Sequence, residues 1–360
     1  MALAAWVALV AATCIPTLAA AKEADAAGGA MAIDPMISLR PLPTRLYKTR
    51  DSGHERTESW TLWLLVETGR PRALAVQGVD IQLLAGKQVT RSVHLGEEGT
   101  KALTIKPPFP PKRPDGSAPP SPIYWPQAVR LRFTEAAAAK VDAMNVSVEL
   151  AEEGKTVRAV AMLPLETFTQ KTSLVYPFKG RGIITQAGVT NGGHRNRSGQ
   201  FALDGVGLDK SYAMYLPGGG EKREDHAGWG RALIAPADGT VVRARGDRPD
   251  QPDPEKSDPK YYAPEHPNGG DPGNHVVIDH GNGEFSMIAH LQEKSLRVKV
   301  GDRVRQGQEL GKLGSSGDTV TPHVHYQLQS GPDIEWSDGL PCTFVNIDDT
   351  LVRGTFFRAK

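Results

Sequence analysis

Residues 322–328 read Pro-His-Val-His-Tyr-Gln-Leu, and polar side chains alternate there with apolar ones. Successive side chains on a β-strand point to opposite faces, so this alternation predicts a strand with one polar and one buried face. His323, His325 and Gln327 would share the polar face, while the apolar residues between them enter a core. Two imidazoles on one face can bind a metal ion or divide the work between metal ligand and general base. The pair is weak support for a metal site by itself, so further ligands must come from elsewhere in the chain.

The chain around this stretch predicts an antiparallel all-β domain. Short β-prone runs bounded by glycine or proline are typical of such a domain. The predicted strands cover residues 239–244, 275–279, 284–291, 296–300 and 323–328. Residues 245–273 form a long insertion that is rich in proline and charged residues and has no apolar period. An insertion of this length inside a compact domain is usually functional or disordered.

Three further polar residues precede the histidine pair. His290 lies near the end of the alternating run 284–291, His194 follows two glycines, and Asp204 ends the apolar run Phe-Ala-Leu. Two histidines and one carboxylate supply the ligands of an open catalytic zinc site, whose fourth position is left for water. Zinc lowers the pKa of that water to about 7, which makes hydroxide available for attack on an amide carbon.

The order of these residues resembles that of the lysostaphin/LytM-type zinc metallopeptidases. The connecting stretches 235–242, 273–283 and 298–308 resemble the same family. The resemblance covers roughly residues 176–345 and does not extend to the amino-terminal region. Because several segments match in order, the resemblance is highly specific.

The resemblance implies a role for each of five residues. His194, Asp204 and His325 would bind one Zn²⁺, His323 would take the proton from the zinc-bound water, and His290 would orient or stabilise the developing oxyanion. One departure concerns the first motif, which in the family usually has three residues between histidine and aspartate. Here nine residues separate His194 from Asp204, so the intervening loop must fold back to present His194.

The implied activity is that of a zinc metalloendopeptidase acting on bacterial peptidoglycan, with stem peptides or cross-bridges as partners. The sequence leaves open which peptide bond is cut. One alternative is a catalytically silent module that binds cell wall or activates another hydrolase, but all five expected polar groups are present. Another alternative is a biotinyl or lipoyl carrier domain, suggested by the glycine turns near Gly301 and Gly307. The lysine flanked by methionines that would carry the cofactor is missing.

The amino-terminal region, residues 36–172, predicts a second all-β unit of unknown role. Alternating or β-prone runs cover residues 60–66, 145–150 and 157–163, a hairpin turn is expected at 152–155, and a short helix at 135–143. The proline-rich residues 106–122 predict an exposed loop. A β-sandwich, of which the immunoglobulin-like arrangement is one form, is the simplest architecture. No catalytic constellation is found there, because His54 and His94 are isolated.

The start of the chain indicates export. Residues 2–21 are uncharged and end in Leu-Ala-Ala-Ala before Lys22, a pattern typical of a cleaved signal peptide. Residues 22–35 would form a tether. An uncleaved membrane anchor is the alternative. We therefore expect a periplasmic or extracellular bacterial protein, with residues 173–360 as its peptidase domain.

Composition agrees with this organisation. Hydrophobic residues at 39% can build real cores, whereas 38 glycines and 28 prolines suit short strands joined by turns. A formal net charge of +1 lacks the excess of positive charge that is typical of nucleic-acid-binding proteins. Removing the signal peptide leaves only Cys342, which is expected on a buried strand and cannot form an internal disulfide.

Overall fold

The computed structural model describes residues 33–42, 45–50, 57–68, 75–105, 124–152, 154–188, 194, 196–220, 222–266, 270–334, 336–348 and 350–360. The predicted signal peptide, most of the predicted tether, the proline-rich residues 106–122 and His54 lie outside these ranges. Within them, strands dominate and the only α-helix is the seven-residue α1, so the predicted all-β class is confirmed. None of the described helices is long and apolar enough to pass through a bilayer.

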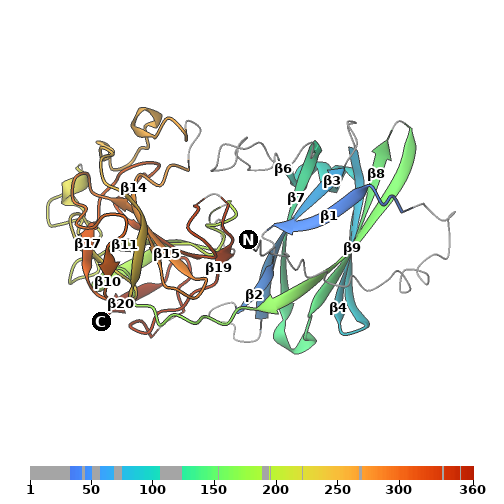
Figure 1. Ribbon diagram of the computed structural model, residues 1–360, viewed down its shortest axis with the longest axis horizontal. Coiled ribbons are helices and arrows are strands. Elements are labelled where there is room, and N and C mark those ends of the chain that lie inside the picture. Colours follow the sequence, from blue (N-terminus) through green and yellow to red (C-terminus); the bar gives the residue numbers. More distant parts are fainter. Residues whose placement is uncertain are drawn as a thin grey trace, which may run out of the picture.

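The first group of strands, drawn in blue to green in Figure 1, forms one continuous path of hydrogen-bonded neighbours. The path runs β5-β4-β8-β9-β2-β3-β7-β6, with β1 paired to β3, and among these described strand pairs only β2–β9 is parallel. The elements are β1 (Ile37–Leu42), β2 (Leu46–Arg50), β3 (Thr57–Thr68), β4 (Ala75–Ala85), β5 (Gln88–Leu95), α1 (Glu97–Leu103), β6 (Thr104–Ile105), β7 (Tyr124–Ala136), η1 (Ala137–Ala139), β8 (Ala143–Glu152) and β9 (Lys155–Thr167).

Alternating burial shows that the two halves of this path, β5-β4-β8-β9 and β2-β3-β7-β6, face each other. On β4, Val79, Ile81 and Leu83 are fully buried, and they join one hydrophobic cluster with side chains of β3, β7 and β8. Trp60 of β3 stacks on Phe133 and lies 3.2 Å from the Met144 sulfur of β8. The halves therefore enclose a common core, as in a sandwich. The immunoglobulin-like form stays a prediction.

The expected strands and hairpin of this region are present, but the helix predicted at 135–143 was wrong. The hairpin pairs Glu152 with Lys155, and Gly154 has the positive φ of 78° that the turn requires. Instead of the helix, β7 continues to Ala136, and a single turn, η1, ends at Ala139. Alanine is the strongest helix former, but helix propensity is readily overridden by tertiary context. A short segment between two long paired strands gains more from the ladders than from one helical turn.

The second group of strands forms an antiparallel sheet in the order β16-β13-β14-β15-β18-β11-β10-β20, with β19 paired to β18 and a separate pair β12-β17 (Figure 1). Its elements are β10 (Gly180–Ala187), β11 (Leu203–Gly207), η2 (Arg223–Asp225), β12 (Ala232–Ile234), β13 (Gly239–Arg245), η3 (Pro259–Tyr261), β14 (Asn274–Asp279), β15 (Phe285–Leu291), β16 (Arg303–Val304), β17 (Glu309–Lys312), β18 (Val324–Gln329), β19 (Gly339–Leu340) and β20 (Phe356–Ala359).

Four of the five strands predicted here are present, and the strand predicted at 296–300 was wrong. That segment is irregular and ends in a tight turn, in which the Asp302 amide donates to the Lys299 carbonyl and Gly301 has a φ of 92°. Val298 is still buried, which explains its apolar character. The predicted strand around Cys342 is also absent, because β19 ends at Leu340 and residues 341–344 are irregular.

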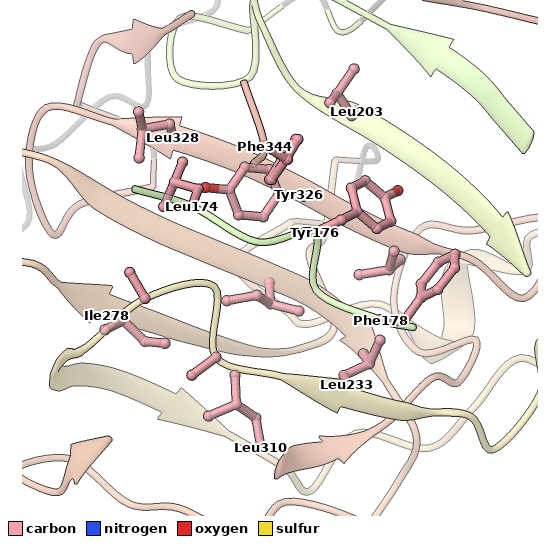
Figure 2. Packing of buried hydrophobic residues seen from close by; sticks show 14 of the residues in the cluster. Leu174, Tyr176, Phe178, Leu203, Leu233, Ile278, Leu310, Tyr326, Leu328 and Phe344 are labelled. Carbon is pink, nitrogen blue, oxygen red and sulfur yellow. The ribbon is translucent and has the colours of Figure 1, made fainter. Parts of the chain in front are cut away.

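One face of this sheet covers the main core. Figure 2 shows Tyr176 and Phe178 lying across the sheet with Tyr326 and Phe344 beside them. The Tyr176 ring packs edge-on against Phe178 and Phe344, at centroid distances of 5.0 and 5.1 Å. A Cβ at Gly205 would lie 1.9 Å from the Tyr176 hydroxyl oxygen, so only glycine fits at this point of β11.

The opposite face of the same sheet carries the polar residues. Val324, Tyr326 and Leu328 of β18 are fully buried in the core, as the alternation predicted. His325 and Gln327 therefore point to the other face. The sheet thus separates a hydrophobic core from a row of buried polar side chains.

Candidate metal centre

The three predicted ligands converge on this polar face. Asp204 of β11 and His325 of β18 are directly paired in the ladder. His325 Nδ1 lies 3.0 Å from Asp204 Oδ1, and His194 Nε2 lies 3.1 Å from both carboxylate oxygens. One ligand atom from each residue lies within 4.8 Å of the others. Asp204 and His325 are buried, whereas His194 is partly exposed.

The donor set fits zinc. Ligands about 2.0–2.1 Å from a tetrahedral zinc ion lie about 3.3 Å apart, close to the separations that these atoms already have. His325 Nε2 lies 2.9 Å from Gln327 Oε1, so a neutral ring that donates there has its Nδ1 electron pair toward the carboxylate. The Nδ1 of His325 and the Oδ1 of Asp204 are then two acceptors only 3.0 Å apart, an arrangement that a bound cation would stabilise.

Charge inside the site is shared between the carboxylate and the imidazoles. Burial alone would raise the pKa of Asp204, but the neighbouring His194 and His323 hold it well below its usual value. Burial likewise opposes protonation of His194, yet the Asp204 carboxylate raises the pKa of that ring. The site is therefore a buried negative charge surrounded by imidazoles, which attracts a cation.

A β-bulge directs His290 toward the same place. Ala289 pairs with His275 and Leu291 pairs with Asn274, so His290 is the extra residue of β15, and its φ is 60°. Bulges beside active sites commonly re-aim a side chain. The His290 ring lies 4.7 Å from the His323 ring, and its Nδ1 lies 2.8 Å from the Ser316 carbonyl oxygen. Since a carbonyl only accepts, Nδ1 carries the proton, which leaves the Nε2 of the neutral ring unprotonated.

His323 is held in the same way. Its Nδ1 lies 2.6 Å from the Thr321 carbonyl oxygen, and its Nε2 lies 3.7 Å from Asp204 Oδ1. The neutral ring therefore presents an unprotonated Nε2 to the candidate metal position.

Burial lowers the pKa of His290 well below its usual value, and the neighbouring His323 and His325 lower it further. His290 and His323 thus have the form of proton acceptors.

The other histidines are not in this cluster. His275 is buried, and its Nδ1 lies 2.9 Å from the Gly273 carbonyl oxygen. His280 bonds to the Asp238 carbonyl and to Ser286, whereas His226 is buried against Tyr215 without a described partner for either ring nitrogen. His94 is exposed and bonds to Asp80.

Sequence reasoning did not identify the loop that supports His290 and His323. Residues 315–321 supply both carbonyl acceptors, and the insertion 245–273 holds this loop in place. Gln251 donates to the Gly317 carbonyl, while Tyr262 donates to the Asp318 carboxylate at 2.6 Å. Gly273 has a φ of 59°, and a Cβ there would lie 2.2 Å from the Ser316 carbonyl oxygen. The only sequence signal was the glycine that opens the stretch 273–283.

The sequence profile described as "Peptidase family M23" matches residues 226–335, which include His290, His323 and His325. This segment belongs to peptidase family M23. His194 and Asp204 precede the matched M23 segment, and the ladder between β11 and β18 brings Asp204 to it.

Proteins similar to this chain include two curated proteins and one solved structure. The peptidoglycan DD-endopeptidase ShyC of Vibrio cholerae is 46% identical over 56 residues, which are 16% of this chain and 12% of ShyC. The cell division protein DipM of Caulobacter vibrioides is 25% identical over 185 residues, 51% of this chain and 22% of DipM. The catalytic domain of lysostaphin from Staphylococcus simulans is 18% identical, with 45% of this chain and 88% of that domain covered and a TM-score of 0.26. The matches thus span less than a quarter of either curated relative.

Proposed function

We propose that this protein is an exported zinc metallopeptidase that hydrolyses peptide bonds of bacterial peptidoglycan. The observation that carries the proposal is the convergence of His194, Asp204 and His325 beside the two unprotonated nitrogens of His290 and His323. Membership of residues 226–335 in the M23 family supports it. Peptidoglycan enzymes among the relatives support the substrate class and an exported location.

His194, Asp204 and His325 would hold one zinc ion. Zinc at this place supplies a Lewis acid for the scissile carbonyl and makes water acidic enough to react near neutral pH. His323 would accept the proton of the attacking water at Nε2, because its Nδ1 proton is committed to the Thr321 carbonyl.

His290 would stabilise the oxyanion, and the geometry sets a condition for that role. Its Nδ1 proton is committed to the Ser316 carbonyl, so it can donate to an oxyanion only through a protonated Nε2. Burial and two neighbouring rings lower its pKa. In the resting enzyme His290 is therefore a neutral acceptor at Nε2, and only its protonated form could donate to the oxyanion.

The names of the relatives suggest where to look for the scissile bond. ShyC and the DD-carboxypeptidase/endopeptidase Mpg of Neisseria meningitidis are both named for D,D-peptide bonds. D,D-cross-links are accordingly the first substrates to assay, before glycine cross-bridges and other stem-peptide bonds.

Elemental analysis of the purified chain tests the metal part of the proposal. We expect about one zinc per chain in the wild-type protein and much less in Asp204→Asn, since the buried carboxylate is the only anionic ligand. A wild-type protein that holds no transition metal, and folds equally well in chelator, would instead support the silent wall-binding module.

A further inference from the structure

We propose that Gln327 and Gln329 are positioning residues that fix the tautomer of His325 and so direct its Nδ1 electron pair to the metal position. The inference rests on the proposed function insofar as His325 is a metal ligand. The observation behind it is a buried row of side-chain hydrogen bonds along β18, which leads from His325 to backbone carbonyls beyond the end of the strand.

The row consists of alternate residues on one face of β18. His325, Gln327 and Gln329 are 7%, 2% and 0% exposed, so solvent can satisfy few of their polar groups. Buried amides that lack partners cost folding free energy, and these amides are instead bonded to one another. Two glutamines on a buried face beside a hydrophobic patch of Val277, Met287 and Ala289 call for such an arrangement.

Backbone carbonyls set the direction of the row. The Gln329 side-chain nitrogen lies 2.7 Å from the Gly331 carbonyl oxygen and 3.3 Å from that of Asp333. Carbonyls only accept, so the nitrogen of Gln329 must face them and its oxygen must face Gln327. Gln327 therefore donates its nitrogen to Gln329 and presents its own oxygen to His325 Nε2, 2.9 Å away.

This direction leaves one neutral form of His325. Facing an acceptor, Nε2 must carry the proton, and Nδ1 is then an acceptor directed at the metal position. Without the row, the ring could place its proton on Nδ1 and donate it to Asp204 Oδ1, 3.0 Å away. That proton would occupy the direction that the metal needs. The row therefore favours the metal-binding tautomer before the metal arrives.

The end of the row is itself firmly held. Arg243 pairs with the Asp333 carboxylate at 2.7 Å, and the Trp336 amide donates to the same side chain. The loop 331–338 also bonds to the segment that follows His194, through Ser198 to the Ile334 carbonyl and through Arg197 to Asp338. The residues around the end of the row thus also contact the segment that follows His194.

Substitutions at Gln327 separate its two hydrogen bonds. Leu has a similar volume but neither accepts nor donates, whereas Glu still accepts the His325 Nε2 proton but cannot donate to Gln329. Ser286→Ala is the matched control, because it removes a buried hydrogen-bonding group from the core face of the neighbouring strand β15, off the row.

The experiment combines two measurements on the full chain. Nitrogen-15 NMR of the histidine rings in the zinc-free protein reports which nitrogen of His325 carries the proton, and competition with a chromophoric chelator reports zinc affinity. We expect the Nε2–H form in wild type, Gln327→Glu and Ser286→Ala. Gln327→Leu should shift His325 toward the Nδ1–H form and weaken zinc binding by about 10- to 100-fold, the usual effect of losing a hydrogen-bond partner of a ligand.

An Nδ1–H form in the wild type would overturn the proposal, as would a Gln327→Leu variant with wild-type zinc affinity. If Gln327→Leu does not fold, Gln329→Leu serves instead and should show a smaller change in the same direction. Neither measurement uses peptidoglycan. A protein that shows the expected tautomer and zinc affinity but no hydrolysis would therefore contradict the proposed function and leave this inference intact.

Discussion

Each of three imidazoles at the site has one ring nitrogen bonded to a fixed acceptor. The acceptors are the Ser316 carbonyl for His290, the Thr321 carbonyl for His323 and the Gln327 side chain for His325. The other nitrogen of each neutral ring is left without a proton. Donor and acceptor positions, and not the mere presence of histidine, therefore decide what each ring can do.

Substitution of the histidine pair should separate ligand from base. His325→Ala should lose both zinc and hydrolysis, since it removes a bond to the metal. His323→Ala should keep zinc and lose turnover by roughly two to four orders of magnitude, the range for a positioned general base. Zinc content and kcat of the two variants check this. An exchange of the two phenotypes would reverse the assignment within the pair.

At the level of single elements, alternation predicted most strands but not the bulge that completes the site. A regular β15 would place His290 on the same face as Ile288, which is in the core. The extra residue in the ladder turns His290 to the other face, and the carbonyl that holds it comes from residue 316. The alternation of residues along β15 contains no information about a hydrogen-bond partner as distant in sequence as Ser316. Strict alternation would have placed His290 in the core, and only the resemblance to a family suggested a role for it at the site.

The His194 segment shows the same limit. Nine residues separate His194 from Asp204, and no local signal says how they fold back. The structure attaches this segment to residues 334–339, through Ser198, Arg197 and an amide of Gly339 that donates to the Arg197 carbonyl. Contacts with residues more than a hundred positions away therefore hold the segment that follows His194.

Gly273 offers a test of the loop that supports His290 and His323. Gly273→Ala would force a Cβ to within 2.2 Å of the Ser316 carbonyl oxygen at a positive φ of 59°. Displacing that carbonyl releases the His290 ring, so we expect a large loss of kcat with zinc content preserved. Gly281→Ala is the control, because its φ of 82° is equally unfavourable but no atom lies within 4 Å of its Cβ. Equal losses in both variants would show that backbone strain alone is responsible.

On the scale of the whole molecule, the buried hydrophobic residues form one large cluster under each group of strands, although Tyr47 of β2 packs in the second cluster. The division into two domains stays a prediction. Segment 170–172 belongs with the second group of strands, because Glu284 accepts the amides of Lys171 and Thr172, both at 2.8 Å, and Gln170 bonds to Thr343. The boundary predicted at residue 172 stays a prediction. These contacts place the best start for a truncated chain at residue 168 or 169.

A chain that begins at residue 168 should fold, keep zinc and hydrolyse small soluble muropeptides. Action on whole sacculi tests the role of the amino-terminal region. Lower activity would indicate a wall-binding module, and higher activity a segment that lies over the metal centre. A chain that begins at residue 174 lacks the bonds to Glu284 and should be less stable. Loss of zinc in every soluble truncation would mean that the two regions fold as one.

Acid should destabilise the protein through its buried histidines. Burial lowers the folded-state pKa of His275 and His280, so the unfolded chain, with a histidine pKa of about 6.5, binds more protons as the pH falls. The neutral histidines therefore contribute fully to the free energy of unfolding above about pH 6.5. Below that pH the free energy of unfolding declines, by at most about 1.4 kcal/mol per pH unit for each histidine. Urea unfolding of wild type and His280→Gln between about pH 7.5 and 5.5 measures this. The variant should show a shallower decline, and an equal slope would rule out His280.

The most direct test of the central claim is mass spectrometry of purified cross-linked muropeptides incubated with the zinc-loaded protein, with Asp204→Asn as the control. Hydrolysis of a peptide bond adds one water, so each cross-linked dimer should yield two monomers whose summed mass exceeds that of the dimer by one water. We predict these products with the wild-type chain and none with Asp204→Asn or in chelator. Intact dimers after incubation with a folded, zinc-bound wild-type protein would contradict the account.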